Sequence, residues 1–451
     1  MNIHFIAIGG SAMHNLAIAL HKKGYHVSGS DDEIFEPSKS RLAKYNLLPK
    51  KFGWFPENIT QNLDAIILGM HARIDNPELL KAQEMGLKIY SYPEYLYEQT
   101  KDKFRVVIGG SHGKTTTTSM VMHVLKDNNI NFDYMVGANI EGFETMVHLS
   151  NESEIAIFEG DEYLSSPIDM RPKFHLYKPN LGLITGIAWD HINVFPTFEN
   201  YIEQFKLFTN LIEPNGTLVY FKEDQLVEEL SNNVSTTIET IPYGTPVYKI
   251  EENRVKLKYN NQNIELNIFG EHNLQNLAGA KIICNKLGLT DSQFFNSISS
   301  FKGAAKRLQK LKEKNDTTIF LDFAHSPSKL KATVEAVKQQ FENRKIIACM
   351  ELHTFSSLKK EFLPQYKNTM LDADLAYVYF NPETIKHKKL EEISKELVKA
   401  SFESNNVQVY NDSQELITKI KSINLENTCL LFMTSGNFSG VDLKEFANKL
   451  V

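Results

Sequence analysis

A glycine-rich loop that carries a lysine is the feature of this sequence that points most directly to chemistry. The loop reads Gly110-Ser111-His112-Gly113-Lys114-Thr115, and it lies between a predicted strand at 105–108 and a helix-compatible run of threonines. Glycines let backbone N–H groups turn inward around a phosphate, and the partial charge at the start of the following helix adds to the attraction. Lys114 supplies a point charge for the β- and γ-phosphates, and the hydroxyl of Thr115 or Thr116 can ligate Mg²⁺. The loop therefore predicts an ATP site.

One position of the loop departs from the complete phosphate-loop pattern. Ile108 stands where GxxxxGK[ST] has its first glycine, so a purely structural turn is the alternative interpretation. The strand–loop–helix context favours the nucleotide.

Acidic residues follow the next predicted strand. Glu159 comes directly after Ile155–Phe158 and begins the run Glu159-Gly160-Asp161-Glu162-Tyr163. A carboxylate at the end of a strand beside a phosphate loop is where a Mg²⁺ ligand is expected, although a solvated acidic turn is the commoner fate of such a cluster. Asp190-His191 follows the run Leu183–Ile187 in the same way. Mg²⁺ prefers oxygen ligands, so His191 in such a site would be unusual.

Asparagines and charged residues further along the chain are weaker candidates. Asn273 and Asn276 lie three residues apart on one predicted helical face, where their amides can read an adenine edge or simply cap the helix. Arg307 and Asp322 lie beside predicted strands or turns of the last third of the chain, and each alone is an ordinary surface charge.

The elements that must position these residues alternate between strand and helix almost from end to end. This alternation predicts an α/β architecture with largely parallel sheets. We divide the chain into three domains, at residues 1–100, 101–302 and 303–451. The principal predicted strands are Ile3–Ile8, Tyr25–Ser28, Ala65–Leu68, Leu87–Tyr90, Arg105–Ile108, Ile155–Phe158, Leu183–Ile187, Thr318–Leu321, Lys345–Cys349 and Cys429–Met433.

The composition argues against some classes of function, including broad binding to nucleic acid. With 451 residues, 42% hydrophobic content and a net charge of −6, the chain can bury several cores, but it is not suited to broad phosphate neutralisation on nucleic acid. Three scattered cysteines form no metal-binding spacing and are expected to be buried. No signal peptide and no membrane-spanning run are seen, so we expect a cytoplasmic protein with no membrane partner.

Seven short motifs, taken in order, resemble the Mur ligase family over essentially the whole chain. They are IGGSAM at 8–13, SGSD at 28–31, GSHGKTT at 110–116, EGDEY at 159–163, DH at 190–191, GEHNLQN at 270–276 and DFAHSP at 322–327. Chance agreement with one motif is easy, whereas ordered agreement with seven is not.

The resemblance implies a Rossmann-like N-terminal domain for a UDP-sugar, a central P-loop ATPase domain and a Rossmann-like C-terminal domain for the amino substrate. It implies ATP and Mg²⁺ as cofactors, with Lys114, Glu159 and His191 at the catalytic centre. Thr115 and Glu159 would ligate a first metal and His191 a second. The resemblance also implies which residues bind each part of the ligands. Gly9, Gly10, Ser11 and Asp31 would bind the UDP portion, and Asn273 and Asn276 would bind adenine. Arg307 would contact the phosphates, Asp322 the ribose and His325 the substrate.

Two positions depart from the common pattern of the family, and a third position is ambiguous. Ser111 replaces the usual threonine of the loop but keeps the hydroxyl, and Asn193 stands where a second aspartate is common. Lys206 falls about where several members carry a carbamylated lysine, and we interpret it as an ordinary helix lysine.

The opening motifs resemble the branch of the family that accepts UDP-N-acetylmuramate itself. Within this branch the amine comes from L-alanine or from the tripeptide L-alanyl-γ-D-glutamyl-meso-diaminopimelate. The stretches 161–163, 169–174, 323–325 and 435–440 resemble the peptide-adding members, so the small peptide is the predicted partner and L-alanine the alternative. We expect a monomer or a weak homodimer.

Other classes of function remain as alternatives. Folylpolyglutamate or cyanophycin-type ligases share the loop but not the N-terminal motifs. An NAD-dependent dehydrogenase would need GxGxxG spacing, which Gly9-Gly10 does not provide. A non-catalytic nucleotide-binding sensor is the third alternative.

Overall fold

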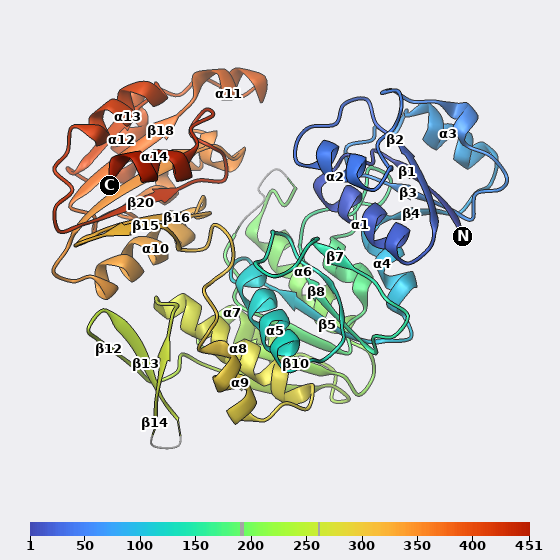
Figure 1. Cartoon of the computed structure of the whole chain (residues 1–451), viewed down its shortest axis with the longest axis horizontal. Coiled ribbons are helices and arrows are strands. Elements are labelled where there is room, and N and C mark those ends of the chain that lie inside the picture. The colour runs from blue at the N-terminus through green and yellow to red at the C-terminus, as the bar shows by residue number, and fades with distance from the viewer. Residues whose placement is uncertain (190–193, 260–261) are drawn as a thin grey trace. The chain divides into compact units, whose positions relative to one another are not determined.

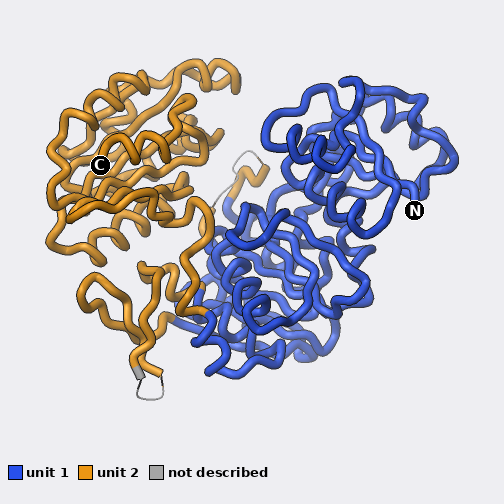
Figure 2. Tube along the Cα trace, in the orientation of Figure 1, with its two compact units in different colours: residues 1–187, 198–244, 277–297 blue, residues 188–197, 245–276, 298–451 orange. Residues whose placement is uncertain are grey.

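The protein is described by a computed structural model that covers residues 1–189, 194–259 and 262–451 (Figure 1). Its chain forms two compact units (Figure 2). The first comprises residues 1–187, 198–244 and 277–297, and the second comprises residues 188–197, 245–276 and 298–451.

The first unit contains two sheets built mainly from parallel strands. One sheet has the order β2 (His26–Ser30), β1 (Asn2–Ile6), β3 (Ala65–Leu68), β4 (Ile89–Ser91). The other has the order β11 (Glu239–Tyr243), β10 (Thr217–Phe221), β9 (Leu181–Ile184), β5 (Phe104–Gly109), β8 (Ile155–Glu159), β6 (Asp133–Met135), β7 (Val147–His148). Only the edge pair β6–β7 is antiparallel among the described pairs of these sheets.

The second unit contains a six-stranded sheet and a small antiparallel sheet. The larger sheet has the order β15 (Gln309–Lys314), β16 (Thr317–Asp322), β20 (Thr428–Met433), β17 (Lys345–Leu352), β18 (Leu375–Phe380), β19 (Val407–Tyr410), and β15 runs antiparallel to its neighbour. The smaller one consists of β12 (Tyr248–Glu251), β13 (Arg254–Tyr259) and β14 (Gln262–Leu266). The prediction of an α/β fold with largely parallel sheets is confirmed.

Helices connect the parallel strands, as right-handed crossovers require. In the first half of the chain they are α1 (Ser11–Lys22), α2 (Ser38–Lys44), α3 (Pro77–Glu84), α4 (Tyr92–Thr100), α5 (Lys114–Asp127), α6 (Phe198–Asn210) and α7 (Gln225–Ser231), with 3₁₀ turns η1 (Pro56–Asn58) and η2 (Lys173–Tyr177). They continue as α8 (Glu271–Lys286), α9 (Asp291–Ile298), α10 (Pro327–Gln340), η3 (Ser356–Leu358), η4 (Leu363–Tyr366), α11 (Pro382–His387), α12 (Lys395–Phe402), α13 (Ser413–Lys421) and α14 (Leu443–Leu450).

Two predicted strands end earlier in the structure than in the sequence analysis. The first strand ends at Ile6 because Ala7 adopts a left-handed backbone with φ of 67°. The strand predicted at Leu183–Ile187 is β9, which runs from Leu181 to Ile184. It stops there because Gly186 has φ of 149°, which turns the backbone out of the sheet.

The turn after β1 brings together the N-terminal residues predicted to bind the UDP portion. The N–H of Gly9 donates to Asp31 Oδ2 at 2.7 Å, and a Cβ at Gly9 would lie 2.9 Å from the same oxygen. Gly10 is the residue before α1, and Ser11 is exposed at the start of that helix. Burial raises the pKa of Asp31 to about 6, against the opposing N–H of Gly9, and the neighbouring Asp32 adds to the rise.

A buried arginine joins the end of α4 to the central sheet. Arg105 is 3% exposed, and its guanidinium donates to the carbonyls of Lys101 at 2.7 Å and Lys178 at 2.9 Å. Further donors reach the carbonyls of Thr100, Lys103 and Tyr177. The last helix before the central sheet and the segment after η2 are therefore fixed by one side chain.

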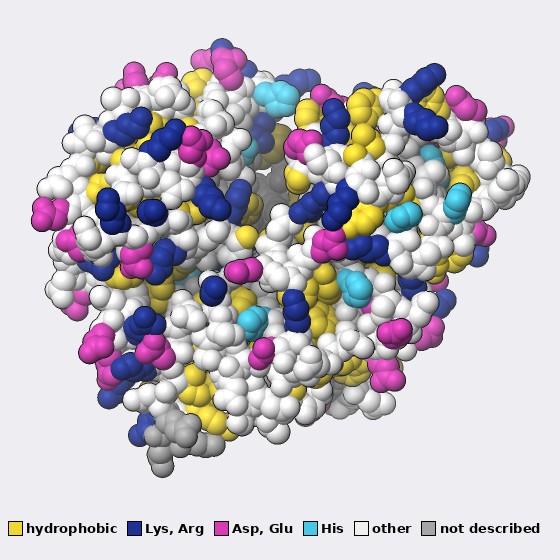
Figure 3. Space-filling model, viewed as in Figure 1, with side chains coloured by type: hydrophobic (Ala, Val, Ile, Leu, Met, Phe, Trp, Pro, Cys, Tyr) yellow, Lys and Arg dark blue, Asp and Glu magenta, His cyan; other side chains and the backbone are white. Residues whose placement is uncertain are grey.

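The surface and the core agree with the composition. Lys and Arg side chains are interspersed with Asp and Glu on the face shown in Figure 3.

The three cysteines are buried, as predicted, at 0% exposure. Among the residues that the structure describes, no helix is long and apolar enough to cross a bilayer.

Asp31→Asn is expected to change how stability depends on pH. The folded-state pKa of about 6 lies above the ordinary 3.8, so between these values the unfolded chain has released a proton that the folded chain keeps. The wild-type protein therefore loses stability as the pH rises through this window, and the variant lacks that loss. After allowance for solvent screening, the variant should gain about 1–2 kcal/mol over the wild type between about pH 4 and pH 7.

Urea unfolding of both proteins across this pH range measures the difference. The matched control is Asp75→Asn, because the Asp75 side chain is 64% exposed. Parallel stability curves for Asp31→Asn and the wild type would contradict the assignment of a raised pKa to Asp31.

Candidate active site

The glycine-rich loop connects β5 to α5 and is held by the residue that follows β9. Gly110 has φ of 131°, and a Cβ there would lie 2.0 Å from Thr185 Oγ1, so a side chain does not fit. The Thr185 hydroxyl donates to the carbonyl of Gly109 at 3.2 Å and also to the carbonyl of His112. Gly113 caps α5 with φ of 82°. The Thr185 hydroxyl therefore fixes the predicted loop at the carboxyl edge of the sheet.

Lys114 is the first residue of α5, and its side chain folds back over the loop. Its Nζ donates to the carbonyl of Gly110 at 2.6 Å and to Glu162 Oε2 at 2.6 Å. The side chains of Lys114 and Glu162 are 13% and 1% exposed. Burial disfavours the ammonium, but the carboxylates of Glu162, Asp161 and Glu159 outweigh this effect and raise the pKa of Lys114. The lysine is therefore a charged donor inside the loop.

Thr115 and Glu159 place two oxygen atoms side by side next to the loop. The Thr115 hydroxyl donates to Glu159 Oε1 at 2.7 Å, while the N–H of Gly137 donates to Oε2 at 2.6 Å. A Cβ at Gly137 would lie 2.9 Å from the Glu159 carboxylate, so glycine is required for this contact. A hydroxyl and a carboxylate are hard oxygen ligands, and this donor set fits Mg²⁺.

Among residues 1–189, 194–259 and 262–451, no group of three His, Cys, Asp or Glu side chains is arranged to hold a metal ion. Mg²⁺ sites in nucleotide-binding proteins need only one or two protein carboxylates, because phosphates and water supply the other ligands. His191, together with Asp190 and Asn193, lies outside the described residues.

Two side chains of the site were not predicted to act there. Glu162 was part of the acidic run but was not assigned a role, and its contact with Lys114 follows from the turn that comes after β8. Tyr201 of α6 is fully buried, and its hydroxyl donates to Glu162 Oε1 at 2.9 Å. Ser111 Oγ lies 2.8 Å from the same hydroxyl, so the serine that replaces threonine still uses its oxygen. Nothing in the local sequence marks Tyr201.

The remaining predicted residues belong to the second unit. Asn273 and Asn276 lie near the start of α8 and are each 6% exposed, and the Asn273 amide donates to the carbonyl of Phe269 at 2.8 Å. Asp322 ends β16, and its carboxylate accepts the N–H groups of Leu308 at 2.6 Å and Ala324 at 2.7 Å.

Arg307 and His325 both contact Phe323. The Arg307 guanidinium lies 4.7 Å from the centre of this ring, and the His325 ring meets it edge-on at 5.1 Å. Nδ1 of His325 is 2.9 Å from the Phe323 carbonyl. The structure thus places Arg307, Asp322 and His325 around one short segment, and their predicted ligand contacts stay predictions.

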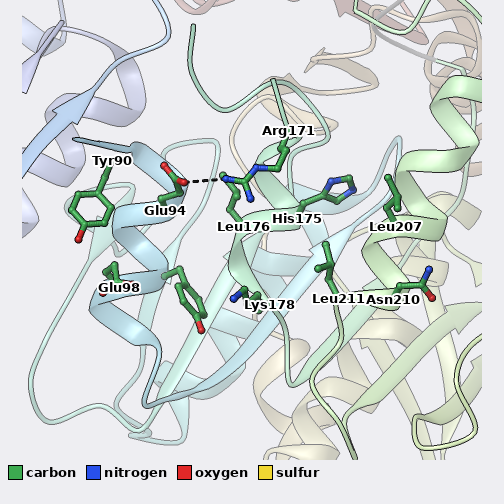
Figure 4. A pocket seen from close by; sticks show the side chains of 11 residues that line it. Tyr90, Glu94, Glu98, Arg171, His175, Leu176, Lys178, Leu207, Asn210 and Leu211 are labelled. Carbon is green, nitrogen blue, oxygen red and sulfur yellow. Dashed lines mark hydrogen bonds and ion pairs between the residues drawn. The ribbon is translucent and has the colours of Figure 1, made fainter. Parts of the chain in front are cut away.

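A separate cavity of about 470 Å³ lies on the first unit between α4, η2 and α6 (Figure 4). Arg171 and Glu94 meet at its rim, with Nη2 and Oε1 3.1 Å apart. Leu176, Leu207 and Leu211 supply apolar lining. None of the predicted site residues that the structure describes lines this cavity, so it is distinct from the candidate active site.

Three family profiles match successive parts of the chain. Residues 2–104 match "Mur ligase family, catalytic domain", residues 108–284 match "Mur ligase middle domain", and residues 306–436 match "Mur ligase, glutamate ligase domain". The UDP-N-acetylmuramate–L-alanine ligase of Caldicellulosiruptor bescii is 32% identical over 387 residues, which cover 83% of this chain and 82% of the relative.

Solved structures share the fold over nearly the full length. A UDP-N-acetylmuramate–alanine ligase from Thermotoga maritima has a TM-score of 0.72 at 22% identity and covers 100% of this chain and 98% of its own. A murein peptide ligase from Psychrobacter arcticus has a TM-score of 0.68 at 20% identity and covers 99% of both chains. The three-domain α/β fold predicted from the motifs is confirmed. The chain belongs to the Mur ligase family, whose members are ATP-dependent ligases that form amide bonds in peptidoglycan synthesis.

Proposed function

We propose that this chain uses ATP and Mg²⁺ to join the lactyl carboxylate of UDP-N-acetylmuramate to the amine of L-alanyl-γ-D-glutamyl-meso-diaminopimelate. The observation that carries the proposal is the charged Lys114 ammonium, which lies over the glycine-rich loop 2.6 Å from the Gly110 carbonyl. The next residue, Thr115, donates its hydroxyl proton to Glu159 and forms the oxygen pair with it. A cation and a magnesium ligand pair are what a triphosphate needs.

The proposed reaction has two steps. A carboxylate oxygen of the sugar attacks the γ-phosphorus of ATP, so that ADP leaves and an acyl phosphate forms. The peptide amine then attacks the activated carbonyl, phosphate leaves, and the nitrogen loses a proton. A free carboxylate is a poor electrophile, which is why the coupling to ATP is needed. Lys114 and the loop N–H groups hold the phosphates in line and stabilise their charge.

Bound Mg²⁺ would neutralise charge on the transferring phosphoryl group. Thr115 and Glu159 would hold it, and the proposed second ion would use His191. We further propose that residues 1–100 hold the UDP-sugar through Gly9, Gly10, Ser11 and Asp31, that residues 101–302 hold ATP, and that residues 303–451 hold the peptide. Asn273 and Asn276 would read adenine, Arg307 the phosphates, Asp322 the ribose, and His325 would touch substrate.

The acceptor is proposed from the segment that follows Glu162. In this segment Lys173 Nζ lies 2.6 Å from Asp161 Oδ2, and Arg171 forms a two-pronged ion pair with Asp169. The acidic run and the motif at 169–174 resemble the peptide-adding members, which supports the tripeptide. The name of the Caldicellulosiruptor bescii relative supports L-alanine as the second candidate. The two solved relatives fit the fold with similar TM-scores, 0.68 and 0.72, so the segment carries the choice.

Lys114→Ala is expected to reduce kcat/KM for ATP by about a hundredfold to a thousandfold, because the transferring phosphoryl loses its fixed cation. Phosphate release in the presence of UDP-N-acetylmuramate and acceptor measures this change. Lys449→Ala, at a side chain 73% exposed, is the matched control and should behave as the wild type. Near-normal turnover of a folded Lys114→Ala protein would refute the role of the loop.

The acceptor is tested by comparing the tripeptide with L-alanine under the same conditions. We expect phosphate release that depends on both UDP-N-acetylmuramate and the tripeptide, with much weaker turnover on L-alanine. Mass spectrometry of the product identifies the amide formed. Efficient turnover with L-alanine and none with the tripeptide would replace the proposed acceptor and leave the ATP chemistry in place.

A further inference from the structure

A chain of hydrogen bonds runs from one end of the glycine-rich loop to the other through two buried side chains. The Lys114 ammonium donates to one oxygen of Glu162 at 2.6 Å, and the Tyr201 hydroxyl donates to the other at 2.9 Å. Because the tyrosine hydroxyl has a single proton, the Ser111 hydroxyl 2.8 Å away is the donor in the last link. Glu162 therefore has a bonded partner on each of its carboxylate oxygens.

Glu162 is fixed more firmly than the lysine that it holds. Its side chain is 1% exposed, whereas that of Lys114 is 13% exposed and long enough to move. Tyr201 is fully buried, and its ring meets that of Phe205 edge-on at 5.2 Å, which anchors the hydroxyl to α6. Leaving a buried carboxylate without its cation is costly, so the carboxylate keeps the ammonium in place when nothing else binds it.

Nucleotide phosphates need the same ammonium. A lysine has three N–H donors, and one of them is already directed at Glu162 and one at the Gly110 carbonyl. A phosphate oxygen that arrives in the loop therefore competes with the Glu162 carboxylate for the charge of Lys114. Such a competition would weaken nucleotide binding and favour ADP release, because the Glu162 carboxylate can form its ion pair with the ammonium again.

We infer that Glu162 is a displaceable counterion of Lys114, which holds the ammonium over the glycine-rich loop and releases it when phosphate binds. The inference rests on the proposed function of the loop. It makes Glu162 a positioning residue, since it acts through Lys114, and it makes Tyr201 the residue that fixes Glu162.

Glu162→Gln tests this role, because the amide keeps the shape of the side chain and removes its charge. The expected result is tighter nucleotide binding, with Kd for ADP and KM for ATP both lower by about threefold to tenfold and with no rise in kcat. Calorimetric titration with ADP and steady-state phosphate release measure these constants. A variant that had merely lost structure would bind nucleotide more weakly. A gain in affinity therefore distinguishes removal of the counterion from damage to the fold.

Tyr201→Phe provides a second variant that removes one hydroxyl and leaves the charge. It should shift Kd for ADP in the same direction by a smaller factor, since Glu162 loses its anchor but keeps Lys114. The matched control is Glu203→Gln, because Glu203 lies on the same helix and its side chain is 50% exposed. This variant should bind ADP with the Kd of the wild type. If Glu162→Gln does not fold, the Kd of Tyr201→Phe for ADP tests the inference instead, and an unchanged or higher Kd would contradict it.

Unchanged or weaker ADP binding in a folded Glu162→Gln protein would overturn the inference. Lys114→Ala separates this failure from failure of the proposed function. If Lys114→Ala weakens ADP binding while Glu162→Gln leaves it unchanged, only the counterion role is wrong. If Lys114→Ala binds ADP as the wild type does, the nucleotide site itself is wrong.

Discussion

The candidate site depends on keeping one ammonium charged where water scarcely reaches it. Lys114 can remain protonated there because Glu162 is held 2.6 Å away and two further carboxylates lie near. This requirement explains why an acidic turn must follow β8 and why α6 must bring a hydroxyl to it. The strand order of the central sheet meets the requirement, since β8 and β9 flank β5 and their carboxyl ends all reach the loop.

The parts of this arrangement that are local in sequence could be predicted from sequence alone. β3 lies at the predicted residues, and β5 and α5 flank the loop as expected, because an apolar run and glycines before a lysine leave few other folds. The strand at 183–187 was placed too late because its apolar pattern continues through Ile187. The backbone instead leaves the sheet at Thr185, whose hydroxyl is used by the loop.

The parts that depend on distant neighbours could not be predicted. Tyr201 reads as one more aromatic residue of an amphipathic helix, and its partnership with Glu162 appears only when α6 packs beside the loop. The raised pKa of Asp31 likewise comes from burial against the turn after β1, which a sequence does not display. By contrast, the family could be identified from the sequence, because each of its seven motifs is a short continuous stretch that needs no distant neighbour to be seen.

Arg105 has a mechanical consequence. Its guanidinium donates to five backbone carbonyls, three at residues 100–103 and two at residues 177–178. Separating these two segments would break several charge-assisted hydrogen bonds at once. The backbone at residues 100–103 and the backbone at residues 177–178 should accordingly stay together as one local unit.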